Sequence, residues 1–231
     1  MTHLVEWDAP SRRRAEEDWE PPSRRVGRML GELMLAAGLV LVLFAAYATY
    51  GKAWRIESEQ NALAGELDRS WAASAGRPVE GQPMARIHIP KLGRQWAVVE
   101  GVSQADLRKG PGHYPRTAQP GQIGNVAIAG HRISSVFWDV DRLDRGDVIV
   151  AETRTGWFVY RVVRQRLVLP RQVEVIAPSP GRPGEAPRKA MLTLTTCNPK
   201  FQNWQRLVVH AELVREQAKS RGRPAELKGH P

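Results

Sequence analysis

The stretch Met191–Leu213, MLTLTTCNPKFQNWQRLVVHAEL, decides the fold and contains the one cysteine of this 231-residue chain. It consists of two alternating, Leu-, Val- and Thr-rich runs, separated by Asn198-Pro199 and a short polar connection. Such runs are typical of half-buried strands, and Asn-Pro cannot continue a central strand. The stretch therefore predicts a pair of strands, with Cys197 ending the first and Arg206 opening the second.

Similar short strand patterns, with turn signals between them, begin at Ala85 and continue to the end of this stretch. One short helix is expected at 104–109, where Ser103 is a suitable N-cap and Asp106 the matching acid at the third helical position. With so many strands and so little helix, the pattern favours a compact, mostly β fold, either a barrel or a sandwich. The eight expected strands are 85–89, 95–100, 125–130, 147–152, 157–169, 173–177, 190–197 and 206–214.

An apolar segment precedes this domain. Residues 33–50 contain no charged side chain, and as a helix they would span roughly 27 Å, close to the thickness of a bilayer's hydrocarbon core. Because arginines cluster before the segment, the positive-inside rule predicts a single-pass membrane protein with a cytoplasmic N-terminus and an extracellular C-terminal domain. The alternative is a cleaved signal peptide, since Ala46-Tyr47-Ala48 fits a small-x-small cleavage site, and the domain is exported in either case.

These signals divide the chain into five parts, each of a different composition. The N-terminal tail is basic, contains proline and is expected to be disordered, and the stalk combines a helical pattern with an Ala-, Ser-, Gly- and Pro-rich linker. The parts are a cytoplasmic tail at 1–28, a transmembrane anchor at 29–51, an extracellular stalk and linker at 52–84, the β-domain at 85–215 and a polar C-terminal tail at 216–231.

Composition excludes several classes of function. The formal charge of +10 favours an anionic neighbour, but the basic residues are scattered without the pattern of a nucleic-acid module, so no nucleic-acid partner is expected. A single cysteine excludes an internal disulfide and a multi-cysteine metal site. No Gly-rich phosphate loop follows a strand, and the aspartates of 139–147 lack the spacing of a calcium-binding loop. We therefore expect neither a cofactor nor a bound metal.

Cys197 is a candidate nucleophile, although a lone cysteine is more often a small buried hydrophobe. Strand alternation places it on the same face as Thr193 and Thr195, and that face is polar for a core position. It also lies where its strand ends, and side chains at strand ends line clefts in which a thiol can react.

A nucleophilic thiol needs a base or cationic partner that favours the thiolate. His131, directly after the strand 125–130, is preferred over His113 in the loop GPGHYP, because rigid elements position catalytic groups better. His88 and His210 lie within predicted strands, and His210 is expected to face solvent.

Arg206 is the third candidate. If its strand pairs with that of Cys197, its guanidinium can reach a carbonyl oxygen held at the thiol, and a fixed cation there would stabilise the oxyanion formed on attack. Together with Cys197 and a histidine, this arrangement predicts acyl transfer through a thioester.

These motifs resemble those of the sortases, membrane-anchored cysteine transpeptidases of Gram-positive bacteria. The resemblance rests on TLTTC ending at Cys197, on the eight-residue spacing to Arg206 and on AGHR around His131, and it covers residues 85–214. Two segments, GPGHYPRTAQPGQIGNVAIAGHR and LTLTTCNPKFQNWQRLVVHAEL, are most similar to class E sortases of actinobacteria, with class D next. Three features depart from the class E pattern: Asn198, the pair Asn203-Trp204 and the run that follows His131. They leave the fine substrate preference open.

The resemblance implies an eight-stranded sortase-type β-barrel with one or two short helices, preceded by the transmembrane helix. It implies that Cys197 attacks the Thr–Gly bond of a C-terminal LAxTG- or LPxTG-like sorting signal, with His131 as general acid and base. Arg206 would then bind substrate and stabilise the oxyanion, and Tyr114 and Thr196 would be substrate-binding residues.

The implied partners are secreted proteins bearing such a signal and, as acceptor, an amine of a peptidoglycan precursor. The alternative is a non-catalytic, membrane-tethered β-domain that binds a cell-wall or secreted partner. The two differ in whether His131, Cys197 and Arg206 converge in space.

Overall fold

The computed structural model of the protein describes residues 22–73, 76 and 79–229, and the chain forms two units, residues 1–50 and 51–231. The helix α1 (Pro22–Ala72) begins in the first unit and ends in the second. Residues 22–28, assigned above to a disordered tail, are therefore helical, whereas residues 1–21 lie outside the described part. The predicted stalk is likewise helical as far as Ala72.

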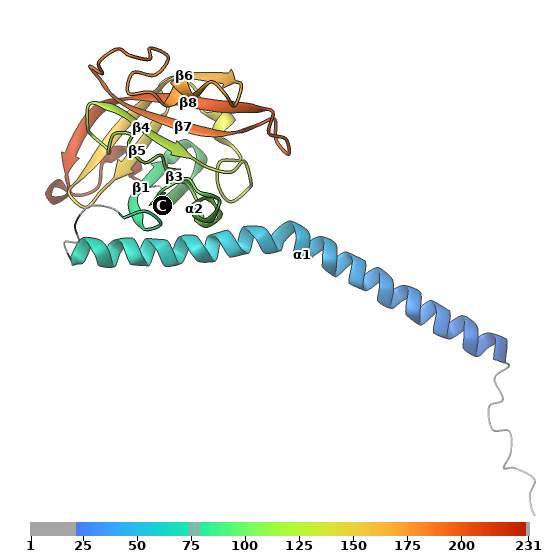
Figure 1. The fold of residues 1–231 in the computed structure, drawn as a ribbon. Coiled ribbons are helices and arrows are strands. Elements are labelled where there is room, and N and C mark those ends of the chain that lie inside the picture. Colours follow the sequence, from blue (N-terminus) through green and yellow to red (C-terminus); the bar gives the residue numbers. More distant parts are fainter. Residues whose placement is uncertain (1–21, 74–75, 77–78, 230–231) are drawn as a thin grey trace, which may run out of the picture. The chain divides into compact units, whose positions relative to one another are not determined.

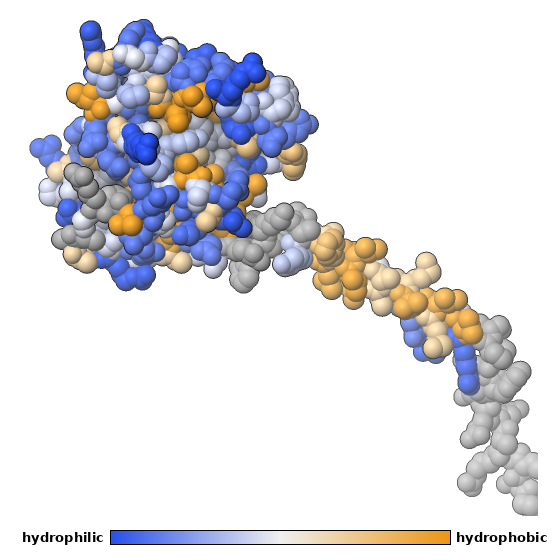
Figure 2. All heavy atoms as spheres, in the orientation of Figure 1, coloured by the Kyte–Doolittle hydropathy of each residue, from blue (hydrophilic) through white to orange (hydrophobic). Residues whose placement is uncertain are grey.

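The first unit contains one segment that is long and apolar enough to cross a membrane, the 24 residues Arg24–Tyr47. Figure 2 shows its apolar side chains, in orange, exposed along the segment, and Leu33, Leu39 and Phe44 are each more than half exposed. Exposed apolar side chains over such a length suit a lipid environment or a signal sequence.

The second unit contains a closed, mixed β-barrel with the strand order β1-β2-β3-β4-β7-β8-β6-β5 (Figure 1). The pairs β2–β3 and β4–β7 are parallel and the other pairs are antiparallel. The predicted eight-stranded barrel is thus confirmed. Its strands are β1 (Pro83–Ile89), β2 (Arg94–Glu100), β3 (Gly112–His113), β4 (Gly124–Ala129), β5 (Val148–Glu152), β6 (Gly156–Val168), β7 (Ala190–Asn198) and β8 (Gln205–Ala218).

The helices of the barrel domain are short. The helix α2 (Gln104–Lys109) has the predicted capping box, in which Ser103 accepts from the backbone N–H of Asp106 and the Asp106 carboxylate accepts from the backbone N–H of Ser103. The 3₁₀ turns are η1 (Pro90–Leu92), η2 (Val140–Arg142), η3 (Val173–Ile176), η4 (Lys219–Arg221) and η5 (Ala225–Leu227).

One predicted strand is wrong and one strand was missed. Residues 173–177 form the turn η3 instead of a strand, and Val175 is buried there against Val168 and Val208. A short apolar run can bury its side chains in a turn as well as in a strand, and periodicity alone does not separate the two. β3 has only two residues, too few to show any alternation.

Within the second unit, the C-terminal part of α1 packs on the barrel. Leu63 contacts the outer residues Ala97 and Val99 of β2. The Gln60 amide accepts from the backbone N–H of Ala97 at 2.9 Å and donates to the carbonyls of Ala97 and Lys109 at 3.2 and 2.9 Å. Because β3 is so short, this side chain takes the place of a neighbouring strand beside Ala97, whose backbone groups would otherwise lack partners.

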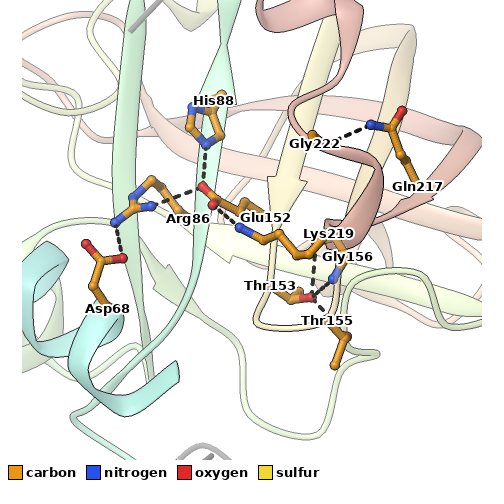
Figure 3. A network of polar contacts seen from close by, with 10 residues as sticks. All are labelled: Asp68, Arg86, His88, Glu152, Thr153, Thr155, Gly156, Gln217, Lys219 and Gly222. Atoms are coloured by element: carbon orange, nitrogen blue, oxygen red, sulfur yellow. Dashed lines mark hydrogen bonds and ion pairs between the residues drawn. The ribbon is translucent and has the colours of Figure 1, made fainter. Parts of the chain in front are cut away.

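A buried ion cluster lies on β1 and β5 (Figure 3). The Glu152 carboxylate, only 6% exposed, is 2.9 Å from His88 Nε2 and 3.1 Å from Arg86 Nη1, and it also forms an ion pair with Lys219. Arg86 in turn binds Asp68 of α1 at 3.0 Å. Burial opposes ionisation of Glu152, but hydrogen bonds from His88 and Lys219 and the charges of Lys219 and Arg86 outweigh it and lower the carboxyl pKa to about 2. The cluster therefore joins helix and barrel through a fully ionised carboxylate.

His210 is buried, so the prediction that it faces solvent is wrong. Its Nδ1 lies 3.0 Å from the hydroxyl of Thr193, which donates to Asn125 Oδ1 at 2.7 Å, and the Asn125 amide donates to the carbonyl of Ala177 just after η3. The segment containing η3 therefore covers this outer face of the barrel. Burial, with the nearby charges of Arg164 and Arg166, lowers the pKa of His210 to about 4.

This burial predicts a pH-dependent stability. Between pH 6.5 and 4 the unfolded chain binds a proton at His210 that the folded chain does not, so the free energy of unfolding should fall by about 3 kcal/mol as pH decreases through this range. Denaturant unfolding of wild type and His210→Gln at steps from pH 7 to 4 checks this, because carboxylates shared by both proteins cancel in the difference. Parallel curves for the two proteins would contradict the prediction.

Candidate active site

Cys197 and Arg206 face each other across the strand pair β7–β8. They are partners in the antiparallel register, one position before the last pair of the ladder. Alternation along β7 puts Leu192 and Leu194 into the barrel core and Cys197 on the outer face. Both Cys197 and Arg206 are half-buried, so the thiol remains within reach of solvent on the strand that neighbours Arg206.

His131 is brought to the same place by β4. This strand runs parallel to β7 with Ala129 opposite Thr195, and the backbone N–H of Gly130 donates to the carbonyl of Thr195 at 3.0 Å. His131 follows Ala129 by two residues, as Cys197 follows Thr195, so the two residues lie at the same end of the β4–β7 pair. The three residues singled out from the sequence therefore converge at one end of the strands β4, β7 and β8.

His113, the alternative histidine, is 0% exposed. Its Nδ1 lies 2.9 Å from the Glu100 carboxylate, and its Nε2 lies 3.0 Å from the carbonyl of Ala118 and 2.9 Å from the hydroxyl of Thr117. Both ring nitrogens are engaged within the barrel wall, so His113 has no open face for a substrate.

Arg206 is partly committed to the connection between β7 and β8. Its Nη1 donates to the carbonyls of Asn203 and Gln205 at 2.7 and 3.0 Å. Within residues 22–73, 76 and 79–229, its Nη2 and Nε have no hydrogen-bond partner. The guanidinium is thus held by one nitrogen and has further donors to offer an acceptor near the thiol.

The side chains of Tyr114 and Thr196 are on opposite sides of β7. Tyr114 comes from the loop after β3, and Thr196 belongs to β7 itself. The hydroxyl of Tyr114 is 3.4 Å from that of Thr195, which shares a face with Cys197 two residues further along the strand. Thr196 is only 3% exposed and points away from this face, with its buried hydroxyl unpaired within the described part of the chain. Tyr114 is therefore close to the candidate nucleophile, whereas the Thr196 side chain has no open surface toward it.

Several neighbours were not identified from the sequence. Arg132, next to His131, is buried and bonds to the strand end that contains Cys197, and its position in AGHR was the only signal for it. Phe201 and Trp204 in the β7–β8 connection are 93% and 54% exposed, and Phe201 stacks edge-on against Trp138 at 5.2 Å. The site thus has an apolar rim beside a polar centre.

No group of three or more His, Cys, Asp or Glu side chains able to hold a metal ion occurs among the residues that the structure describes. In the aspartate-rich run, Asp144 and Asp147 both bind the ammonium of Lys91 at 2.7 Å. These carboxylates are therefore committed to an ion pair at the surface.

Comparison with known proteins agrees with this geometry. A sequence profile described as "Sortase domain" matches residues 87–214. Sortase SrtE1 of Streptomyces coelicolor is 34% identical over 213 residues, which are 87% of this chain and 60% of that protein. Sortase D of Bacillus subtilis is 29% identical over 141 residues, which are 61% of this chain and 67% of the relative.

A crystal structure of Sortase E1 from Streptomyces coelicolor with a tripeptide in the active site has a TM-score of 0.59 at 35% identity, covering 65% of this chain and 99% of that one. The chain spans only about 60% of the length of SrtE1, and the family match extends from within β1 to within β8. This chain belongs to the sortase family and is more similar in sequence to its class E members than to sortase D.

Proposed function

We propose that this protein cleaves a C-terminal sorting signal of the LAxTG or LPxTG kind between Thr and Gly and joins the shortened protein to an amine of a cell-wall precursor. The observation that carries the proposal is the convergence of His131, Cys197 and Arg206 on three neighbouring strand ends. A thiol, a proton-transfer group and a fixed cation within one site are what acyl transfer through a thioester requires.

In the first step, the Cys197 thiolate attacks the carbonyl carbon of the signal's Thr, and the carbonyl oxygen takes the negative charge. Arg206 donates from a free nitrogen to that oxygen, a cation whose charge does not depend on pH. His131 gives a proton to the Gly amine as the C–N bond breaks, so the leaving group departs neutral. The product is a thioester between Thr and Cys197.

In the second step, the acceptor amine attacks the thioester carbonyl. His131, now neutral, accepts the proton of the amine, and the thiolate of Cys197 leaves as the new amide bond forms. The cycle ends with Cys197 released and with the proton that His131 gave up in the first step returned to it. Water in place of the amine would give hydrolysis with the same residues.

Tyr114 supports the class of signal. Its hydroxyl lies over the face of β7 that carries Thr195 and Cys197, two residues from the candidate nucleophile. We assign Tyr114 to recognition of the signal. A substrate contact of Thr196 remains a prediction, and it would have to involve its backbone because its side chain is buried.

The N-terminal helix supports a position at the membrane. We propose that Arg24–Tyr47 anchors the protein, with the N-terminus in the cytoplasm and the barrel outside, because arginines precede the segment. In that arrangement the site meets secreted proteins and lipid-linked wall precursors on the same side of the membrane.

The test is intact mass spectrometry of residues 52–231 incubated with LAxTG and LPxTG peptides without an amine acceptor. This fragment keeps the helical turn that packs on β2. Wild type should gain the mass of the peptide ending at Thr less one water, as a thioester requires, or should cleave the peptide there, and Cys197→Ala should do neither. If wild type shows neither adduct nor cleavage with both peptides, the non-catalytic binding domain becomes the better description.

A further inference from the structure

Three residues next to the candidate site are hydrogen-bonded to one another and form a relay. Arg132 follows His131, Asn198 follows Cys197, and Gln205 precedes Arg206. Arg132 Nη1 donates to Asn198 Oδ1 at 3.0 Å, and Asn198 Nδ2 donates to Gln205 Oε1 at 3.0 Å. Each of the three is the sequence neighbour of one member of the candidate site. Because side chains of adjacent strand residues point to opposite faces, Asn198 and Gln205 point away from the face of Cys197 and Arg206.

The relay is anchored at its buried end. The Arg132 side chain is 4% exposed, its Nη2 forms an ion pair with Asp141 at 2.9 Å, and its Nη1 also reaches the carbonyl of Cys197 at 3.4 Å. A guanidinium held at both terminal nitrogens is rigid, and its fork suits two acceptors at fixed separation. Arg132 therefore bonds directly to the backbone of the candidate nucleophile.

Backbone pairing by itself does not fix the ends of β4, β7 and β8 relative to one another. The β4–β7 register ends at Ala129 and Thr195, and the next backbone bond, from Gly130, is the last before His131. The β7–β8 ladder ends at the pair Asn198 and Gln205. Beyond such points a strand end frays, yet acyl transfer needs its groups aligned within a fraction of an ångström.

We propose that Arg132, Asn198 and Gln205 are positioning residues that lock the ends of β4, β7 and β8 together and so align His131, Cys197 and Arg206. The relay also affects the thiol itself, because a thiol that is no longer aligned with His131 and Arg206 loses the partners that activate it. This inference rests on the proposed function, but its consequence for the thiol holds independently of any substrate.

The kinetic test compares Arg132→Gln, Asn198→Ala and Gln205→Ala in peptide cleavage. Each should lower kcat by about tenfold to a hundredfold while KM changes less than about threefold, because misalignment affects the transition state and not the binding of the signal. Double variants should be no slower than the slower single variant, since the residues act as a unit. Arg132→Lys should recover only part of the rate, because an ammonium cannot replace the fork.

The matched control is Arg166→Gln. Arg166 lines the same cavity of about 310 Å³ as Arg132 and Asn198, but among the described residues no hydrogen bond or ion pair joins it to the relay, so its loss should leave kcat unchanged. A rise in KM at constant kcat, or rate losses that multiply in the double variants, would overturn the proposal. Because Asn198 and Gln205 are half-buried, their variants decide the matter even if Arg132→Gln does not fold.

A second readout separates this inference from the proposed function. Cys197 is the one thiol in the chain, so its alkylation by iodoacetamide can be timed without any substrate. The three relay variants should react several-fold more slowly than wild type and Arg166→Gln. Slower alkylation in a protein that cleaves neither peptide would keep the relay and reject the transpeptidase, whereas unchanged alkylation with normal cleavage would reject the relay alone.

Discussion

Replacement of Cys197 by serine should reduce cleavage of a sorting-signal peptide by at least about 10⁴-fold, the loss typical of removing the nucleophile of a catalytic triad. Serine fits the same half-buried position in β7, so the barrel should remain folded. The hydroxyl, however, is far less acidic than a thiol, and a nearby histidine and arginine do not ionise it to a useful extent. No thioester can form, and an oxygen ester would form slowly.

The measurement is the initial rate of peptide cleavage by wild type and Cys197→Ser, with thermal unfolding of both proteins as the control for folding. A variant that retains more than about one per cent of wild-type activity would contradict the role assigned to Cys197, because binding and oxyanion stabilisation alone leave only a small residue of catalysis. The serine variant also distinguishes the transpeptidase from the non-catalytic binding domain. A binding domain would cleave the peptide in neither form, and the exchange should not weaken its binding.

The second large effect concerns stability. Glu152→Gln should lower the free energy of unfolding by about 3 kcal/mol at pH 7, because it leaves the partly buried Arg86 and Lys219 without the counter-charge of residue 152. The carboxylate is 6% exposed and contacts His88, Arg86 and Lys219 (Figure 3). The amide has nearly the same shape, so the loss reports charge and hydrogen bonding and not a cavity.

The matched control is Glu212→Gln. Glu212 pairs with Lys189 at 2.8 Å, but both side chains are about a third exposed or more, so this change should cost less than about 1 kcal/mol. Urea unfolding at several pH values measures both variants. Equal effects of the two variants at pH 7 would contradict the assignment of the Glu152 cluster as a buried ion cluster.

The sign of the pH dependence follows from the lowered pKa of Glu152. A carboxyl whose pKa falls from 4.5 to about 2 on folding contributes stability that is fully present above pH 4.5 and is lost as pH falls toward 2. The gap between wild type and Glu152→Gln should therefore narrow over this range. The contribution of His210 to stability is lost in a higher pH range, as pH falls from 6.5 to 4, so the two contributions can be distinguished.

Several elements were predictable because their signals are local. The capping box around Ser103 and Asp106 is a four-residue pattern, and the structure contains it as expected. The strand that carries Cys197 was predictable from alternation, and its end near Cys197 was predictable from the following Asn198-Pro199. By contrast, the run 173–177 looks like a strand but folds as a turn, because the bonding partners that make a strand lie elsewhere in the chain.

His210 shows the same limit of prediction from local sequence. His210 alternates with apolar residues, and alternation alone assigns it to the polar side of a strand. It is nevertheless buried, because the segment around η3 folds over that face and Thr193 provides a hydrogen-bond partner. Burial of an outward-facing residue depends on a distant loop, and no local pattern reports it.

By itself the sequence determined the compartment signal, the strand-rich domain, the thiol at a strand end and the family resemblance, since each is written in residues close together in the chain. Only the tertiary structure decided that β4 and β7 pair in parallel, which brings His131 and Cys197 to the same end of this strand pair, and that Arg132, Asn198 and Gln205 are hydrogen-bonded to one another there. The physical reason is that strand pairing joins backbone groups far apart in sequence. Which strands become neighbours is settled by closure of the whole barrel.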